Sequence, residues 1–245
     1  MSSTAPSKRD RATNSLPSGK GLLDWVKPIL ASSVGSKFLV ALTGLALTGF
    51  VVVHMLGNLQ IFLGPDAINE YAKKLKEMGP LLWAVRIGLL AVFVAHVALA
   101  VGLKIRANEA RPVRYVHEQT VQASFASRTM IYTGLVILAF VAFHIAHYPL
   151  GVVQPVPASA GVKTDAAEKK KDAPVETSLL DLKDSQGRHD VYRMMIIGFS
   201  NPIVAILYVL AQLFLMLHLS HGVASLFQSL GWNTPRLQST WVCVG

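Results

Sequence analysis

The stretch GFVVVHMLGNLQIF, residues 49–62, places His54 and Asn58 inside an otherwise apolar run. The run begins upstream near residue 38, so the segment exceeds the ~20 residues with which an α-helix crosses a ~30 Å hydrocarbon core. Lipid offers no partners to backbone N–H and C=O groups, which favours a helix over an isolated strand. Because an ionisable side chain is costly inside a membrane, His54 indicates a functional or interior position, whereas Asn58 is interpreted as a packing residue.

Three further segments are apolar and long enough to span a membrane, and they cover residues 81–103, 129–152 and 203–230. The chain is 52% hydrophobic and only 15% charged, which lies outside the range of most soluble proteins. The sequence therefore predicts an all-α integral membrane protein, a bundle of four core transmembrane helices. Cys243 is the single cysteine, so disulfides within the chain and covalent haem attachment through CxxCH are excluded.

The net charge of +9 is explained by membrane orientation, and no nucleic-acid partner is predicted. Residues 1–37 carry six Lys or Arg against two acids, and residues 104–128 carry five against two. Both segments are expected on the cytoplasmic side of the membrane. Residues 152–193 carry seven charges of each sign, so the basic N-terminus decides the predicted orientation.

Composition divides the chain into four parts. Residues 1–31 are rich in Ser, Pro, Lys and Arg and are expected to form a flexible cytoplasmic tail. The bundle is expected over residues 32–235, interrupted by a hydrophilic insert at 153–192 that is interpreted as a solvated, partly disordered outer loop. Residues 236–245 begin a new apolar stretch that ends within a few residues, which indicates a truncated fifth helix or an interfacial segment.

Polar residues at two helix starts predict caps. The candidates for the first helix are Ser32, Ser33 and Ser36. The fourth helix is expected to begin with Ser200 or Asn201 as its cap and with Pro202 in the first turn, where a missing N–H costs nothing.

Six of the eight histidines lie in the four apolar segments, namely His54, His96, His144, His147, His218 and His221. Each one alone could simply bond a carbonyl of a neighbouring helix. At ~1.5 Å per residue, His54 and His144 both lie ~25 Å beyond the cytoplasmic ends of their helices. His96 and His218 lie ~23 Å below the outer ends of theirs. Depth therefore sorts four of the histidines into an outer pair and an inner pair.

Paired imidazoles that face each other across a bundle are the arrangement that holds a haem by both axial positions. We therefore expect two non-covalent haem b groups ~15 Å apart, one between His54 and His144 and one between His96 and His218. His147 lies one turn beyond its neighbour, and it is interpreted as a supporting, propionate-binding or packing residue, as is His221 on the fourth helix. A metal or proton pathway and purely structural histidines stay open as alternatives.

Haem propionates need cationic or hydroxyl partners near the membrane surfaces. The candidates are Ser36, Lys37 and Arg128 on the inner side, and Arg86 and Arg193 on the outer side. Snorkelling side chains that anchor a helix at the interface would have the same positions, and the sequence does not separate the two roles.

Four stretches together resemble a known family. They are SSVGSKFLVALTGLALTGFVVVHMLGNL, FVAHVALAVGLKIRAN, IYTGLVILAFVAFHIAHY and FSNPIVAILYVLAQLFLMLHLSHGVASLFQSLGW. Their combination is similar to the dihaem cytochrome b subunit of succinate:quinone oxidoreductase, of the single-anchor bacterial type. The resemblance covers residues 32–235 apart from the insert. Its most specific parts are the spacing of the four histidines and the HLSHGVASLFQSLGW end of the fourth helix.

The resemblance implies the same four axial ligands as the depths do, and it selects His218 rather than His221 in the fourth helix. It also implies two partners on the cytoplasmic side, a flavoprotein subunit with covalent FAD and an iron–sulfur subunit. Electrons would pass through both haems to a quinone, expected to be menaquinone, in a succinate dehydrogenase or fumarate reductase complex. An acid near the outer haem would help to bind the quinone, for which Glu70 and Glu77 are the candidates, and either is equally explained as a solvated charge.

Two features depart from the family. A fifth helix usually follows the turn that here reads GWNTPR, and the insert is longer than in compact members. A haem b anchor of another quinone-linked oxidoreductase, such as a formate dehydrogenase or hydrogenase, remains an alternative that predicts a different histidine distribution. A histidine-lined transporter is a further alternative that would need a continuous polar lining.

Overall fold

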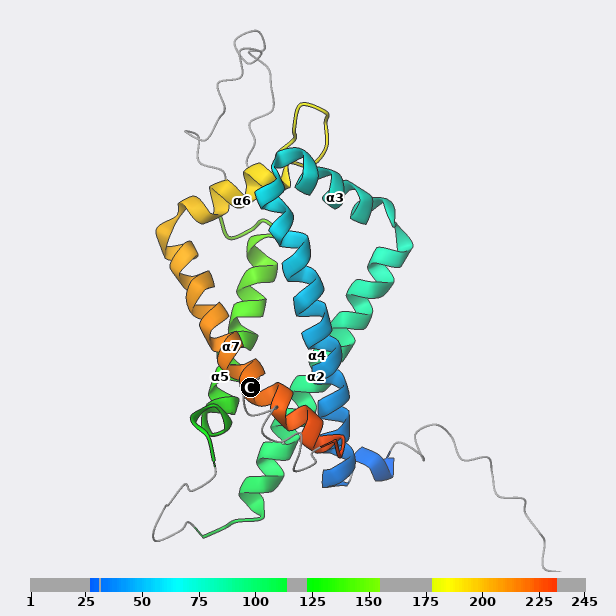
Figure 1. The fold of residues 1–245 in the computed structure, drawn as a ribbon, viewed down its shortest axis with the longest axis vertical. Helices are drawn as coiled ribbons and strands as arrows, with labels where there is room; N and C mark the ends of the chain where they lie inside the picture. Colours follow the sequence, from blue (N-terminus) through cyan, green and yellow to red (C-terminus); the bar gives the residue numbers. More distant parts are fainter. Residues whose placement is uncertain (1–26, 31, 114–122, 155–177, 233–245) are drawn as a thin grey trace, which may run out of the picture.

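The computed structural model of the 245-residue chain describes residues 27–30, 32–113, 123–154 and 178–232 (Figure 1). In chain order its helices are α2 (Ser33–Asn58), the 3-10 helix η1 (Leu59–Leu63), α3 (Pro65–Glu77), α4 (Pro80–Glu109), α5 (Phe125–His147), α6 (Val191–Ser200) and α7 (Pro202–Ser229). No β-strand occurs in these ranges. The fold class is therefore all-α over the part that the structure describes.

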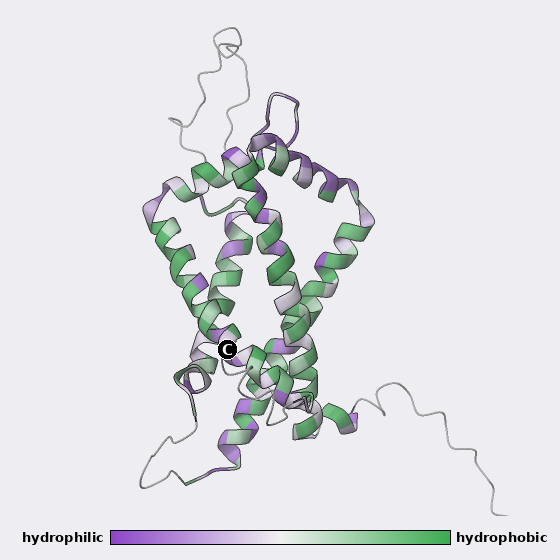
Figure 2. Ribbon diagram, in the orientation of Figure 1, coloured by the Kyte–Doolittle hydropathy of each residue, from purple (hydrophilic) through white to green (hydrophobic). Residues whose placement is uncertain are grey.

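Within the described ranges, four helical segments are long and apolar enough to cross a membrane. They are Ser33–Leu63, which combines α2 with η1, and the helices α4, α5 and α7. Apolar residues dominate these helices, while α3 and the end of α4 are hydrophilic (Figure 2). The prediction of an all-α protein with four helices long and apolar enough to span a membrane is confirmed for the described residues.

The spanning helices pack as two neighbouring pairs, α2 with α4 and α5 with α7, and α2 also contacts α7. α2 and α5 run in one direction, and α4 and α7 run in the other (Figure 1). The short helices α3 and α6 pack against each other at one end of the bundle, which we call the α3/α6 end. The start of α2 and the end of α4 lie at the opposite end.

Side-chain caps begin the first and last spanning helices as predicted. Ser32 is the residue that caps α2, and its hydroxyl accepts a hydrogen bond from Gly35 N–H at 3.3 Å. Asn201 caps α7 by accepting from Ile203 N–H at 3.0 Å, and Pro202 occupies the first turn. These polar residues satisfy backbone donors that the first turn of a helix leaves without partners.

Part of the hydrophilic insert differs from its interpretation as a solvated loop. Residues 178–190 form turns with one isolated bridge between Lys183 and His189. Leu179 and Leu182 are fully buried and pack against α6. These two leucines give the insert an apolar anchor, which its overall polar composition had concealed. α6 itself, and the amphipathic helix α3, were not predicted as separate helices.

Several predictions fall outside the described residues. They concern the tail before residue 27, residues 155–177 of the insert and the apolar stretch at 236–245.

Candidate functional site

The outer histidines meet between α2 and α5. The ring centroids of His54 and His144 lie 5.9 Å apart, with an angle of 80° between the ring planes. Phe50 stacks on His54 at 5.3 Å, and Phe140 stacks on His144 at 6.0 Å, so each imidazole rests on the phenylalanine one turn before it. The structure thus brings together the two outer residues whose depths match in the sequence.

The inner histidines are held in equivalent ways on α4 and α7. Nδ1 of His96 lies 3.0 Å from the hydroxyl of Thr43 on α2. Nδ1 of His218 lies 3.2 Å from the hydroxyl of Thr133 on α5. Each inner imidazole is therefore fixed by a threonine of the adjacent helix with which its own helix packs.

The hydroxyl hydrogens of these threonines are used within their own helices. Thr43 donates to Leu39 C=O at 2.8 Å, and Thr133 donates to Met130 C=O at 2.9 Å. Each hydroxyl oxygen then accepts from the histidine, which places the imidazole proton on Nδ1. The Nε2 lone pair is left available, which is the state in which histidine binds a metal ion.

A glycine follows each threonine and makes room for the ring. A Cβ atom at Gly44 would lie 3.3 Å from Cε1 of His96, and one at Gly134 would lie 3.4 Å from Cε1 of His218. In the structure, the ring beside each glycine is the histidine itself.

The two threonine–glycine pairs belong to a repeat that the sequence analysis missed. TGLALTGFVVVH at 43–54 and TGLVILAFVAFH at 133–144 share the pattern Thr-Gly-Leu, then Phe-Val, then His at identical spacing. Each copy carries the hydroxyl that fixes an inner histidine, the stacking phenylalanine and an outer histidine. This repeat was the signal that could have identified Thr43 and Thr133.

His147 and His221 differ from the four paired histidines. His147 is fully buried, and its two ring nitrogens contact Tyr208 and Gln154. It therefore supports its surroundings rather than facing an open site. His221 is half-buried on α7, one turn beyond His218.

The candidate propionate-binding residues at the opposite end of the bundle differ in exposure. Ser36 is fully buried, and its hydroxyl donates to Leu30 C=O at 3.0 Å. Lys37 and Arg128 are exposed at the same end of α2 and α5. These two cations have the freedom that binding to a carboxylate would require.

At the α3/α6 end, Arg86 lies over the ring of Trp83, 5.2 Å from its centroid. This contact matches an interfacial anchor, because the indole and the cation both suit the membrane–water boundary. Arg193 is half-buried on α6, and its backbone N–H donates to Asp190 at 3.0 Å.

An ionic cluster joins α3 to residues 178–190. The guanidinium of Arg188 contacts Asp184 at 2.6 Å, Asp66 at 2.8 Å and Glu70 at 3.3 Å. Hydrogen bonds that Arg188 donates to Asp66 and Asp184 raise its pKa further above the ordinary value. Burial alone would raise the pKa of Asp184, but hydrogen bonds from Arg188 and Gln186 lower it.

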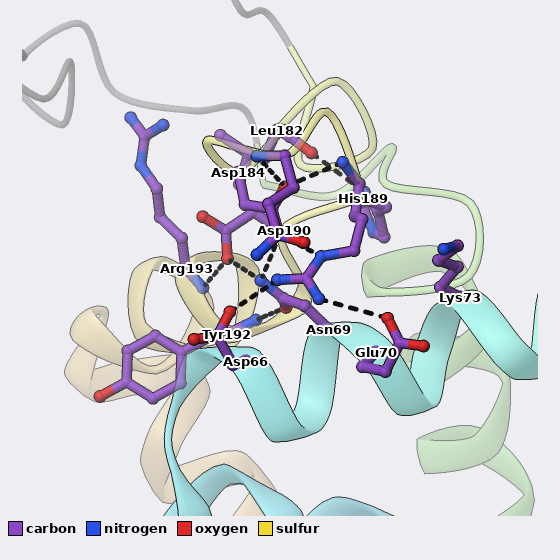
Figure 3. A network of polar contacts seen from close by, with 12 residues as sticks. Asp66, Asn69, Glu70, Lys73, Leu182, Asp184, His189, Asp190, Tyr192 and Arg193 are labelled. Atoms are coloured by element: carbon purple, nitrogen blue, oxygen red, sulfur yellow. Dashed lines mark hydrogen bonds and ion pairs between the residues drawn. The ribbon is translucent and has the colours of Figure 1, made fainter.

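The uncharged side chain of Asn69 adds further hydrogen bonds to this cluster (Figure 3). Its side-chain amide donates to Asp190 at 3.1 Å and accepts from Tyr192 N–H at 3.1 Å. Of the two acids considered for a quinone site, Glu70 belongs to the cluster and Glu77 pairs with Lys73 at 3.8 Å.

Tyr148 is a further residue that sequence reasoning missed. Its hydroxyl is buried and has no hydrogen-bond partner among the described residues. It packs against Gly198 of α6, where any Cβ atom would collide with it, and its ring lies 4.2 Å from that of His147. A buried unpaired hydroxyl is costly, so this one is a candidate to bind a ligand acceptor.

The separation of the outer imidazoles suits a haem iron. Two imidazoles that bind one metal ion from opposite sides, each nitrogen ~2 Å away, have ring centroids about 6 Å apart. The separation of His54 and His144 is 5.9 Å. The chain alone leaves His54 exposed and the other three paired histidines half-buried, so protein does not cover these imidazoles completely.

No family model, curated protein or solved structure matched the chain in three separate comparisons. Its functional interpretation therefore rests on its own sequence and geometry.

Proposed function

We propose that this chain is the dihaem cytochrome b membrane-anchor subunit of a succinate:quinone oxidoreductase, acting as succinate dehydrogenase or fumarate reductase. The observation that carries the proposal is the meeting of His54 and His144 at 5.9 Å, a separation that suits two axial ligands of one iron. His96 and His218 have the same Nδ1–H tautomer, which supports a second site of the same kind. The four motifs that resemble this family support the identity of the complex.

The haems would supply reversible one-electron transfer across the bundle. The chain's own residues bind and orient them, since Thr43 and Thr133 hold the inner imidazoles with Nε2 free. Phe50 and Phe140 orient the outer imidazoles by stacking on them. Such fixed ligands need little reorganisation when the charge at the iron changes.

The proposal assigns partners and a quinone. A flavoprotein with covalent FAD and an iron–sulfur protein would dock on the basic, cytoplasmic end, near Lys37 and Arg128, which are candidates for the inner propionates. The quinone, expected to be menaquinone, would react near the outer haem in a bacterial inner membrane. The unpaired hydroxyl of Tyr148 is available there as a donor to an acceptor oxygen of the quinone or of a propionate.

Difference spectra of the purified complex test the proposal. We expect dithionite-minus-air spectra and the haem-to-protein ratio to give two b-type haems per chain. His54→Ala should abolish one of them and His96→Ala the other, because each removes one axial ligand of a different pair. His221→Ala serves as the control, since it removes a histidine outside both pairs, and it should keep both haems.

The outcomes separate the candidate functions. The absence of haem from the wild-type complex would overturn the proposal and favour a histidine-lined transporter. Two haems without copurified covalent FAD, or without succinate-dependent quinone reduction, would instead favour the anchor of another quinone-linked oxidoreductase.

A further inference from the structure

The hydroxyl of Tyr208 on α7 lies between two imidazoles of α5. It is 3.1 Å from Nδ1 of His144 and 3.1 Å from Nδ1 of His147. A hydroxyl has one hydrogen to donate, so it donates to one of these nitrogens and accepts from the other. The hydrogen bonds made by Gln154 and His147 decide which nitrogen accepts.

The direction of these bonds begins at the last turn of α6. The carbonyl oxygen of Ile197 accepts from the side-chain amide of Gln154 at 3.1 Å and from the hydroxyl of Ser200 at 2.7 Å. Because a carbonyl oxygen only accepts, the amide nitrogen of Gln154 must face it. The amide oxygen of Gln154 is thereby turned toward His147.

His147 passes this direction on. The Gln154 oxygen lies 3.0 Å from Nε2 of His147, and since that oxygen only accepts, Nε2 must carry a hydrogen. His147 is fully buried, and both of its hydrogen-bond partners are uncharged. A buried imidazolium without a counter-charge is costly, so the ring is neutral and Nδ1 accepts.

Tyr208 therefore donates its hydroxyl hydrogen to His147 and accepts from Nδ1–H of His144. We propose that Ile197, Gln154, His147 and Tyr208 form a one-directional hydrogen-bond chain that fixes the proton of His144 on Nδ1. The chain leaves the Nε2 lone pair of His144 free to bind the outer haem iron. This inference rests on the proposed function, and all four are positioning residues.

The hydrogen-bond chain also affects the electronic character of His144 as an iron ligand. An imidazole whose Nδ1–H donates to a fixed acceptor is a stronger electron donor through Nε2, which stabilises the ferric state and lowers the reduction potential. Each inner histidine donates a comparable hydrogen bond to a single threonine. The outer ligand His144 instead depends on a series of groups that reaches the end of α6.

Redox titration of the purified holo-complex tests the hydrogen-bond chain. The variants are Tyr208→Phe, Gln154→Leu and Tyr132→Phe. Tyr132→Phe is the matched control, because that tyrosine lies exposed on α5. We expect Tyr208→Phe to raise the reduction potential of the outer haem and to weaken its binding about 10- to 100-fold. Gln154→Leu should raise the same potential, because His147 and Tyr208 lose their fixed direction. The inner haem should stay unchanged, which also shows that the variants fold.

Contrary results are distinct from one another. An outer potential in Tyr208→Phe equal to that of Tyr132→Phe would overturn the chain, while two wild-type haems would keep the proposed function intact. A shift in Tyr208→Phe without one in Gln154→Leu would also overturn it, because Tyr208 would then act alone. A wild-type complex without haem would contradict the proposed function itself, and this inference with it.

Discussion

Thr43 and Thr133 satisfy the Nδ1–H group of a histidine on the adjacent helix while keeping their own hydrogen within the helix. A histidine inside a membrane would otherwise expose this donor to lipid or leave it unpaired. The loss of one partner of such a buried bond costs about 1–3 kcal/mol. These two hydroxyls therefore influence the inner site although neither would touch the iron.

The first prediction at this scale concerns Thr133→Val, which keeps the side-chain shape and removes the acceptor of His218. Because that imidazole loses its fixed orientation, we expect the affinity of the inner haem to fall about 10- to 100-fold. Transfer of haem to an excess of an acceptor protein measures the loss. Thr129→Val is the control one turn earlier on α5, since its hydroxyl bonds Phe125 C=O and Ala126 C=O. Equal haem transfer from both variants would contradict the prediction.

The meeting of His54 and His144 could be predicted from sequence because depth along a helix follows directly from residue number. The roles of Thr43 and Tyr208 could not be predicted in this way. Their contacts depend on how far each helix is rotated about its axis and on which neighbour it meets. Tyr208, in particular, reaches two histidines that lie 61 and 64 positions away in the chain.

At the scale of elements, the spanning helices were predictable and the short ones were not. Length and apolar composition identify α2, α4, α5 and α7, since a spanning helix is apolar on all sides. α3 and α6 are short, and their stability comes from contacts with each other and with residues 178–190. Arg188 contributes to that contact through Asp66 and Glu70 of α3, and these two carboxylates lie more than a hundred positions away from it, which leaves no local pattern.

Acid should loosen residues 178–190 from α3. The pKa of His189 is lowered by burial and then by Lys76, so its contribution is complete above about pH 6.5 and declines as the pH falls. The pKa of Asp184 is lowered as well, so the contribution of its pairing with Arg188 is complete above about pH 4 and is lost below that. Backbone hydrogen exchange of residues 178–190 between pH 7 and pH 3, corrected for intrinsic rates, measures the loosening.

Arg188→Met should produce faster exchange already at pH 7 and remove the lower of these two steps. Lys73→Met is the control. It breaks an exposed ion pair within α3 and should change the exchange little, since such pairs contribute weakly. A wild-type protein whose exchange does not depend on pH would show that the ionic cluster is not what holds this segment.

At the scale of the whole molecule, charge and architecture agree about which segments share a side. The start of α2 and the end of α4 lie at one end of the bundle, while α3, α6 and residues 178–190 lie at the other (Figure 1). The excess of Lys and Arg in residues 1–37 and 104–128 is expected to keep the first end in the cytoplasm.

Labelling with a membrane-impermeant maleimide tests this orientation in a Cys243→Ser background. Gln186→Cys should react in intact spheroplasts, because its segment is expected outside the membrane. Ala110→Cys should react only after the membrane is opened, since it follows α4 at the cytoplasmic end. The reverse labelling pattern would invert the predicted topology, and reaction of both sites in lysed spheroplasts is the control for accessibility.

The repeated pattern at 43–54 and 133–144 gives α2 and α5 the same threonine, glycine, phenylalanine and histidine at equivalent positions. α2 with α4 forms one half and α5 with α7 the second, and each histidine pair takes one residue from each half. A single helix pair of this kind, present twice and related by a two-fold axis along the membrane normal, would build both sites on that axis. The contacts among the described helices depart from that symmetry, because α2 packs against α7 while α4 and α5 have no contact of similar extent. Tyr208 and Gln154 likewise serve His147 of the second half alone.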